Sequence, residues 1–348
     1  MQSNSPERIE NLFPYFEFPV LIVSTLVGKG IYSIGEAIQE SFERIGAGKK
    51  EVSHISIEEC ISESIYHEDV VRYRLIATYF PFLLHLIYRA PFIYYRKYLR
   101  EQFFDNKGLE KLSEVISRFC PKTILCVSHR PAFWVSNLKR KAEIDSKIWG
   151  VLCEFGRSYG WKYIFWKEME GLLSPVRWED LRGFLPATPY FHHIDLPCKQ
   201  EYRALAKLPI NRNHVLVSGG YWGLSSVYEL VRELLSFSDD REGPLQISVS
   251  TGDNEKSFRK LKNEYGENKR IQIYSKLPSL ASVLGTCGAV ITKPGISTLI
   301  EAHAARRKIF LVKGLPVAED NNARYAIKNF SAEWYSKESF RRWFERRD

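Results

Sequence analysis

The chain has 348 residues, which is more than one ordinary hydrophobic core holds, and its length predicts about two domains. Apolar residues make up 45% and charged residues 26% of the chain, and these proportions exclude a disordered or collagen-like protein. Lysine and arginine outnumber aspartate and glutamate by 50 to 41, and aromatic residues reach 14%, so an anionic or amphipathic partner is expected.

The start of the chain and its six cysteines bear on its compartment. Residues 1–18 lack a basic segment followed by a continuous apolar stretch, so we expect no secretory signal. The cysteines occur singly, without a C-x-x-C pair, which argues against a zinc knuckle and against a disulfide framework. Both observations predict a cytoplasmic protein.

The first half of the chain has the pattern of an α/β domain. Residues 18–27 form a β-branched apolar run that predicts a strand, and a glycine turn leads from it into a helical pattern at 33–45. Further strands are predicted at 123–128, 147–155 and 190–196. The long stretch between the first two strands is predicted to be helical.

The second half repeats this pattern after a polar segment at 198–213, which we expect to link two domains. Strands and helices alternate from residue 214 onward, and the last residues predict an amphipathic helix that packs back on the first domain. We therefore predict two Rossmann-like doubly wound α/β domains facing each other across a cleft. They cover residues 1–197 and 214–330, and the final helix covers 331–348.

Three clusters of small and polar residues follow predicted strands of the second half. At 292–301 a turn of small residues opens a helix and offers backbone N–H groups to a phosphate, while Glu301 is placed to accept hydrogen bonds from a ribose. The glycine-rich segment 219–226 suits a pyrophosphate, and the polar segment 315–325 suits sugar hydroxyls. Taken singly, each is explained equally well by an ordinary strand-to-helix turn or a solvated loop.

The order of these clusters resembles the C-terminal half of the GT-B glycosyltransferases. The most similar group holds monogalactosyldiacylglycerol synthase and the peptidoglycan N-acetylglucosaminyltransferase. Its pattern is a Gly-Gly loop, then K-x-G-x-x-T-x-x-E, then P-G-Q-E-x-x-N-x-x-Y. The chain matches this pattern with Gly219, Gly220, Lys293, Gly295, Thr298, Glu301, Pro316, Glu319, Asp320, Asn322 and Tyr325.

The resemblance implies an inverting glycosyltransferase, a UDP-sugar-dependent hexosyltransferase of glycolipid synthesis. It would move a hexose or N-acetylhexosamine from a UDP-sugar to a membrane lipid acceptor. The first domain would bind acceptor and membrane, and the second would bind the donor, with Glu301 on the ribose and Glu319 and Asp320 on the sugar hydroxyls. The implied nucleotide-sugar-binding residues are Gly219, Gly220, Trp222, Ser225, Leu277, Lys293, Gly295, Ser297, Thr298, Glu301, Glu319, Asp320 and Asn322.

The first half resembles the lipid-using branch of the group more loosely. The family loop G-G-G-H-R-A-S-A-E-A-I corresponds to residues 28–38, where Ile31 replaces the family histidine. The implied acceptor loop consists of Gly28, Lys29 and Gly30.

Glycosyl transfer needs a base for the acceptor hydroxyl and a cradle for the departing diphosphate. Glu154 stands where the family has an acidic residue at the end of a strand, and His129 stands where it has V-H-P. We therefore predict Glu154 as the base and His129 as the second candidate.

No metal or other cofactor is predicted for this reaction. The chain contains no D-x-D sequence, which favours stabilisation of the diphosphate by helix N-termini and Lys293 rather than by a bound cation. His192 and His193 are adjacent on a predicted strand and would point to opposite faces, so they are not expected to share a metal.

Residues 70–100 hold nine aromatic residues and six arginines or lysines without an acidic residue. The stretch free of cations, 75–88, is shorter than the roughly 20 residues that a spanning helix needs, so we predict a segment that lies on an anionic membrane. A buried pair of helices is the alternative. The protein would then be peripheral on the inner face of the membrane, through Arg72, Arg74, Tyr88, Arg89, Tyr95, Arg96 and Lys97.

Other functions remain open at this level. The same architecture serves transferases with soluble acceptors and UDP-sugar 2-epimerases, and the loss of the family histidine at Ile31 also allows a non-catalytic binding protein. A non-catalytic nucleic-acid-binding protein would use the positive charge, but no reader motif for nucleic acid is present. The donor sugar, the acceptor and the oligomeric state cannot be read from the residues.

Overall fold

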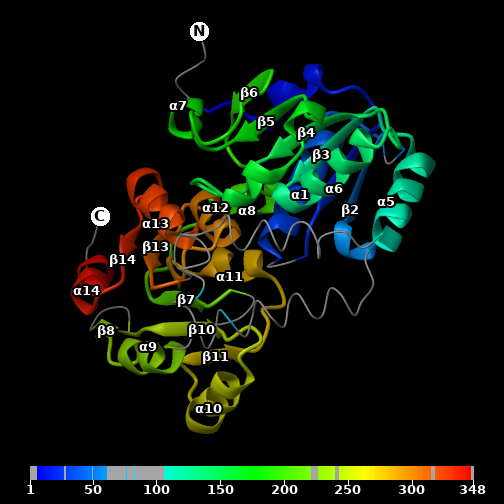
Figure 1. The fold of residues 1–348 in the computed structure, drawn as a ribbon. Helices are drawn as coiled ribbons and strands as arrows, with labels where there is room; N and C mark the ends of the chain where they lie inside the picture. The colour runs from blue at the N-terminus through cyan, green and yellow to red at the C-terminus, as the bar shows by residue number, and fades with distance from the viewer. Residues whose placement is uncertain are drawn as a thin grey trace. The chain divides into compact units, whose positions relative to one another are not determined.

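A computed structural model describes residues 6–26, 29–48, 50–60, 76, 83, 106–220, 226–239, 243–314 and 318–345 (Figure 1). The chain divides into two compact units. The first comprises Met1–Pro197 with Leu315–Ala318, and the second comprises Cys198–Gly314 with Glu319–Asp348. Each unit contains a six-stranded parallel sheet with flanking helices, which confirms the predicted α/β architecture.

The sheet of the first unit has the strand order β2-β1-β3-β4-β5-β6, and all its pairs are parallel. Every residue of β1 and β3 is buried, as expected for central strands covered on both faces. The strands are β1 Val20–Ser24, β2 Val52–Ser56, β3 Thr123–Val127, β4 Lys147–Val151, β5 Gly171–Ser174 and β6 Tyr190–His193. The helices are η1 Ile9–Tyr15, α1 Gly30–Arg44, η2 Ile57–Glu59, α5 Asn106–Phe119, α6 His129–Arg140, η3 Tyr159–Tyr163, η4 Trp166–Glu168 and α7 Trp178–Leu181.

Two strands of this sheet were not predicted. Strand β2 lies in the stretch predicted to be helical, because its sequence VSHIS is half polar and forms a partly buried edge of the sheet. Strand β5 has four residues, which is too short a run for hydrophobic periodicity to separate a strand from a loop.

The sheet of the second unit has the order β11-β10-β7-β12-β13-β14 and is also parallel. Numbered within the unit this order is 3-2-1-4-5-6, so the winding reverses between β7 and β12. The strands are β7 His214–Ser218, β10 Gln246–Ser250, β11 Ile271–Tyr274, β12 Ala289–Thr292, β13 Lys308–Leu311 and β14 Glu333–Trp334, beside an antiparallel pair of β8 Ser238–Asp239 and β9 Gly243–Pro244. The helices are α8 Gln200–Leu205, α9 Val227–Leu234, α10 Glu255–Tyr265, α11 Leu280–Thr286, α12 Ile296–Ala304, α13 Ala318–Asn329 and α14 Lys337–Glu345.

The final helix, α14, is amphipathic as predicted, but its packing differs from the expectation. Phe340 is fully buried and Phe344 is 5% exposed, and both belong to the hydrophobic core of the second unit. The ring of Phe340 contacts Phe237 at 5.0 Å and Phe310 at 5.4 Å between centroids. The prediction that this helix packs on the first domain was therefore wrong, because its aromatic face packs into the hydrophobic core of the second unit.

The predicted linker 198–213 contains helix α8, which packs on α11 and α12 of the second unit. Arg307 anchors the end of this helix to the second unit, because its Nη2 atom donates to the carbonyl oxygen of Leu205 at 3.1 Å.

Among the described residues, no helix is long and apolar enough to cross a membrane. The predicted membrane segment lies outside the described residues, apart from Ile76 and Leu83. This applies to all its named positions, which are Arg72, Arg74, Tyr88, Arg89, Tyr95, Arg96 and Lys97.

Candidate functional site

The second unit places Gly219 and Gly220 after β7 and Lys293 after β12, at the carboxyl ends of these strands, and Glu319 follows β13. Doubly wound sheets bind ligands at this edge, at the point where the strand order reverses. Here the reversal lies between β7, which is followed by Gly219 and Gly220, and β12, which is followed by Lys293. The turn after β13 leads into α13, which carries Glu319.

An ion pair joins two of these turns. Lys293 Nζ donates to Glu319 Oε1 at 2.8 Å, and the two side chains are 16% and 11% exposed. Both charges are therefore largely removed from water, in a place where an ion pair adds little net stability. The pair brings a lysine and a glutamate from two different turns together at the carboxyl edge of the sheet.

Two glycines make room for this ion pair. Gly220 has φ +67°, and a Cβ atom there would lie 3.1 Å from Lys293 Cε. A Cβ atom at Gly314 would collide with Glu319 Oε2 and lie 2.9 Å from Pro294 Cδ. The three turns converge because neither glycine carries a side chain.

The turn before α12 is fixed in a form that suits an anion. Asn322, which is 3% exposed, donates from Nδ2 to the carbonyl oxygen of Pro294 at 3.2 Å, and the backbone N–H of Gly295 donates to Lys293 O at 2.7 Å. Gly295 is the N-cap of α12, and a Cβ atom there would meet open space. The first-turn N–H groups of α12, including those of Ser297 and Thr298, therefore lie at a helix terminus that favours phosphate.

The other residues that were predicted to bind the nucleotide sugar lie in several different elements of the second unit or outside the described residues. Glu301 is 6% exposed on α12, whereas Asp320 is exposed on α13. Leu277 is half-buried in the loop before α11. Trp222 and Ser225 lie outside the described residues.

The first unit gathers polar groups at the carboxyl ends of β1, β2 and β3 around Glu58, whose side chain is 4% exposed. Its carboxylate accepts hydrogen bonds from the hydroxyls of Thr25 and Ser56 and, at 2.8 Å, from the backbone N–H of Leu26. Arg130 Nη1 lies 3.8 Å from the same carboxylate. Glu58 therefore joins the loop after β1 to the first turn of α6.

Of the predicted acceptor loop, Gly28 lies outside the described residues, while Lys29 and Gly30 are the N-cap and first residue of α1. The two candidate bases follow neighbouring strands. Val127 of β3 pairs with Val151 of β4, and His129 and Glu154 come two and three residues later, so both leave the sheet at the same edge.

The ring of His129 is covered by the loop that follows Glu154. A Cβ atom at Gly160 of η3 would collide with this ring. Burial, and to a smaller extent the neighbouring positive charge of Arg130, lower the pKa of His129 to about 4. His129 is therefore neutral at physiological pH and accepts a proton only weakly. By exposed area, both His129 and Glu154 are half-buried.

Sequence reasoning missed Glu58 and Gly314. Residues 56–59 do carry the S-x-x-E signature of a capping box, and the structure forms that box with Ser56 and Glu59. The role of Glu58 depends on contacts with residues more than 30 positions away, which no local pattern reveals. Within the described ranges, no group of three or more His, Cys, Asp or Glu side chains is arranged to hold a metal ion.

No protein-family model matches the chain. Among curated proteins it is similar to the processive diacylglycerol beta-glucosyltransferase of Bacillus cereus strain G9842, with 21% identity over 328 residues, which cover 90% of this chain and 81% of that protein. The protein of the same name from Bacillus cereus strain B4264 is 22% identical over 322 residues, covering 88% and 79%.

Solved structures with the same fold include MurG of Acinetobacter baumannii, with a TM-score of 0.54 and 12% identity over 93% of this chain and 89% of that chain. Os79 of O. sativa, solved in complex with U2F and trichothecene, has a TM-score of 0.59 and 12% identity over 92% and 87%. The chain therefore has the GT-B glycosyltransferase fold, as the sequence predicted.

His129 should make the protein less stable in mild acid. The unfolded chain takes up a proton near pH 6.5, but the buried ring resists it until about pH 4. The free energy of unfolding should thus fall by about 1.4 kcal/mol per pH unit as the pH drops through this window. Urea unfolding at pH values between 4 and 6.5 measures this. The free energy of unfolding should depend less steeply on pH in His129→Asn than in the wild type, and equal slopes in the two proteins would contradict this account.

Proposed function

We propose that the protein is an inverting glycosyltransferase that moves a hexose or N-acetylhexosamine from a UDP-sugar to a membrane lipid acceptor. The observation that carries this proposal is the convergence of three turns on Lys293 and Glu319 at the reversal point of the second sheet. This convergence brings together a cation, an open helix N-terminus and two glycines, which is the chemistry that a nucleoside diphosphate requires.

On donor binding, we propose that the diphosphate replaces Glu319 as the partner of Lys293. A diphosphate carries more negative charge than one carboxylate, so the exchange is electrostatically favourable for a lysine that is 16% exposed. Glu319 is then released to accept hydrogen bonds from the sugar hydroxyls. As the glycosidic bond breaks, Lys293 and the N-terminus of α12 stabilise the charge on the departing diphosphate.

For the acceptor, we propose Glu154 as the base that takes the hydroxyl proton. An inverting reaction needs one base on the side of the sugar opposite to the leaving group. We prefer Glu154 because its half-buried carboxylate follows the end of β4, whereas η3 packs against the ring of His129 at Gly160, and burial beside Arg130 keeps that ring neutral. Glu58 positions the loop after β1 that leads to Lys29.

The lipid acceptor is supported by the relatives that carry the name diacylglycerol beta-glucosyltransferase and align with about nine tenths of this chain. The basic and aromatic composition of residues 70–100 is typical of a segment that binds to an anionic membrane surface. We propose peripheral attachment to the cytoplasmic face. A small-molecule acceptor is the second candidate, because Os79 of the same fold was solved with trichothecene.

The direct test combines calorimetry and product analysis. We expect the purified protein to bind UDP and to transfer one sugar residue from one member of a UDP-sugar panel to diacylglycerol in vesicles, with release of UDP. Mass spectrometry identifies the product, and an epimerase would instead leave the sugar on UDP. Absence of UDP binding would overturn the proposal, whereas transfer only to a water-soluble acceptor would replace the lipid.

Gly220→Ala should weaken UDP binding about tenfold, because the new methyl group would lie 3.1 Å from Lys293 Cε and displace the lysine. Gly183→Ala is the matched control. Gly183 has a similar φ of +75°, but a Cβ atom there meets nothing within 4 Å. Calorimetry should give the wild-type affinity for the control, and equal losses in both variants would attribute the effect to backbone strain.

Glu154→Gln should reduce turnover by about two orders of magnitude or more and leave UDP affinity unchanged, because it removes a proton acceptor that belongs to the first unit. His129→Asn should reduce turnover much less. Steady-state rates with saturating donor measure both effects. If Glu154→Gln kept full activity and His129→Asn lost it, the two roles would have to be exchanged.

A further inference from the structure

A pocket of about 320 Å³ lies at the amino ends of the strands of the second unit. Its walls include Arg212 before β7, Gly288 before β12 and Lys308 at the start of β13. These strands run parallel, so the pocket lies at the edge opposite to the one that carries Lys293 and Glu319. The proposed donor site therefore does not account for it.

The lining of this pocket is strongly cationic. It includes Arg212, Arg306, Arg307 and Lys308, and it contains no aspartate or glutamate. Lys308 Nζ lies 2.7 Å from Glu333 Oε1, which offsets one of the four charges. In the described part of the chain, no carboxylate forms an ion pair with any of the three arginines.

Arg307 is the most buried of these cations, at 4% exposure. Its Nε and Nη2 atoms donate to the carbonyl oxygens of Leu284 at 2.7 Å and Leu205 at 3.1 Å, while Nη1 is buried and has no hydrogen-bond partner among the described residues. Burial lowers its pKa, yet a guanidinium stays charged at neutral pH. An anion in the pocket would supply the counter-charge that this side chain lacks.

The rest of the wall is apolar. Ile210 is 51% exposed, Trp343 is half-buried, and the ring of Phe330 stacks on His303 at 4.1 Å between centroids. Cations beside apolar surface suit an anion that carries an organic group. A phosphate ester has this combination.

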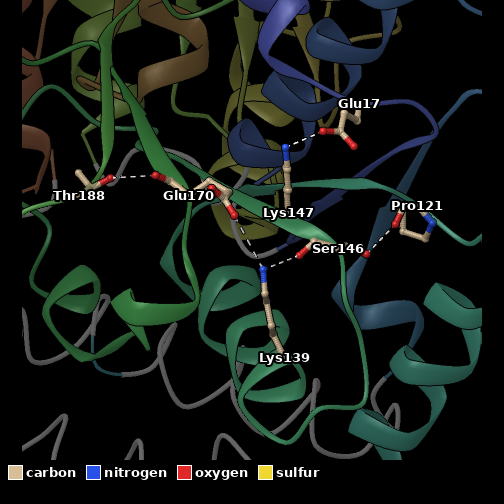
Figure 2. A network of polar contacts seen from close by, with 7 residues as sticks. All are labelled: Glu17, Pro121, Lys139, Ser146, Lys147, Glu170 and Thr188. Carbon is tan, nitrogen blue, oxygen red and sulfur yellow. Dashed lines mark hydrogen bonds and ion pairs between the residues drawn. The ribbon is translucent and has the colours of Figure 1, made fainter.

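A pocket of about 590 Å³ at the amino ends of β3 and β4 in the first unit differs in this respect. It is lined by lysines and carboxylates together, and Figure 2 shows how they pair. Lys147 Nζ lies 2.5 Å from Glu17 Oε1, and Lys139 Nζ lies 4.0 Å from Glu170 Oε1. That pocket neutralises its own charges, whereas the pocket of the second unit does not.

We propose that the cationic pocket of the second unit binds a phosphate ester, supplied by an anionic lipid headgroup or by a free phosphate compound. Arg212 and Arg306 contact the phosphate, and the charge of Arg307 attracts it from behind. Ile210 and Trp343 contact the organic group.

The test uses the full chain with Arg212→Gln and Arg306→Gln combined. The probes are glycerol 3-phosphate in calorimetry and phosphatidylglycerol–phosphatidylcholine vesicles in co-sedimentation. Each lost arginine should reduce affinity for glycerol 3-phosphate about tenfold and vesicle partitioning about fivefold. Arg306→Gln alone is included because Arg306 is exposed and its replacement should leave the fold intact.

Two controls place the binding in the pocket. Arg259→Gln removes the same charge from α10, where the side chain is 72% exposed, and should bind both probes like the wild type. Lys293→Gln alters the proposed donor site and should also keep this binding.

Loss of vesicle binding alone in the double variant assigns the pocket to a lipid headgroup, and loss of glycerol 3-phosphate binding assigns it to a soluble ester. Either result supports the proposal. Absence of binding in the wild type, or equal binding by the wild type and the double variant, overturns it. UDP binding is measured separately, so a failure of the donor site is distinguishable from a failure here.

Discussion

The parallel direction of all strands in each main sheet is the constraint on which the rest of the structure depends. It sends every carboxyl end to one edge and every amino end to the other, so each unit has two chemically different edges. In both units the candidate chemistry lies at the carboxyl edge, around Glu58 and around Lys293. The amino edge of the first unit holds paired charges such as Lys147 with Glu17, whereas the arginines at that of the second form no ion pair with any described residue.

The ion pair of Lys293 and Glu319 contributes little to the stability of the fold. Both side chains are largely desolvated, and the cost of desolvation offsets most of their attraction. Two glycines, Gly220 and Gly314, are needed to accommodate the pair, and glycine itself raises the entropic cost of folding. Under the proposed function, the charged pair keeps the lysine in position until the diphosphate of the donor replaces its partner.

The sequence pattern predicted the order of strands and helices well, because central parallel strands are continuous apolar runs and glycine turns mark their ends. It failed at β2, whose polar VSHIS sequence is half-buried at a sheet edge, and at the short β5. The amphipathic pattern predicted α14 but not the surface that receives its apolar face, since that depends on Phe237 and Phe310 from distant segments.

The candidate site was predictable to the same degree. The spacing from Lys293 to Glu301 predicted a turn of small residues that opens a helix, and the structure forms α12 there, because the turn and its helix are local in sequence. The partnership of Lys293 with Glu319 spans 26 positions, and the contact of Glu58 with Thr25 spans 33, so neither follows from local spacing. The grouping of Arg212 with Arg306 likewise exists only once β7 and β13 are brought to one sheet.

In the proposed reaction, the two carboxyl edges divide the chemistry of glycosyl transfer between them. In the second unit, a cation and a helix N-terminus are fixed before any ligand arrives, which suits a reaction whose leaving group gains negative charge. In the first unit, burial keeps the imidazole of His129 neutral, while the neighbouring Arg130 lies 3.8 Å from the carboxylate of Glu58. A second positive charge there would stabilise the carboxylate of a neighbouring base and weaken its hold on a proton. In the proposed reaction, the lowered pKa of His129 avoids this second charge, so the carboxylate of Glu154 keeps its affinity for a proton.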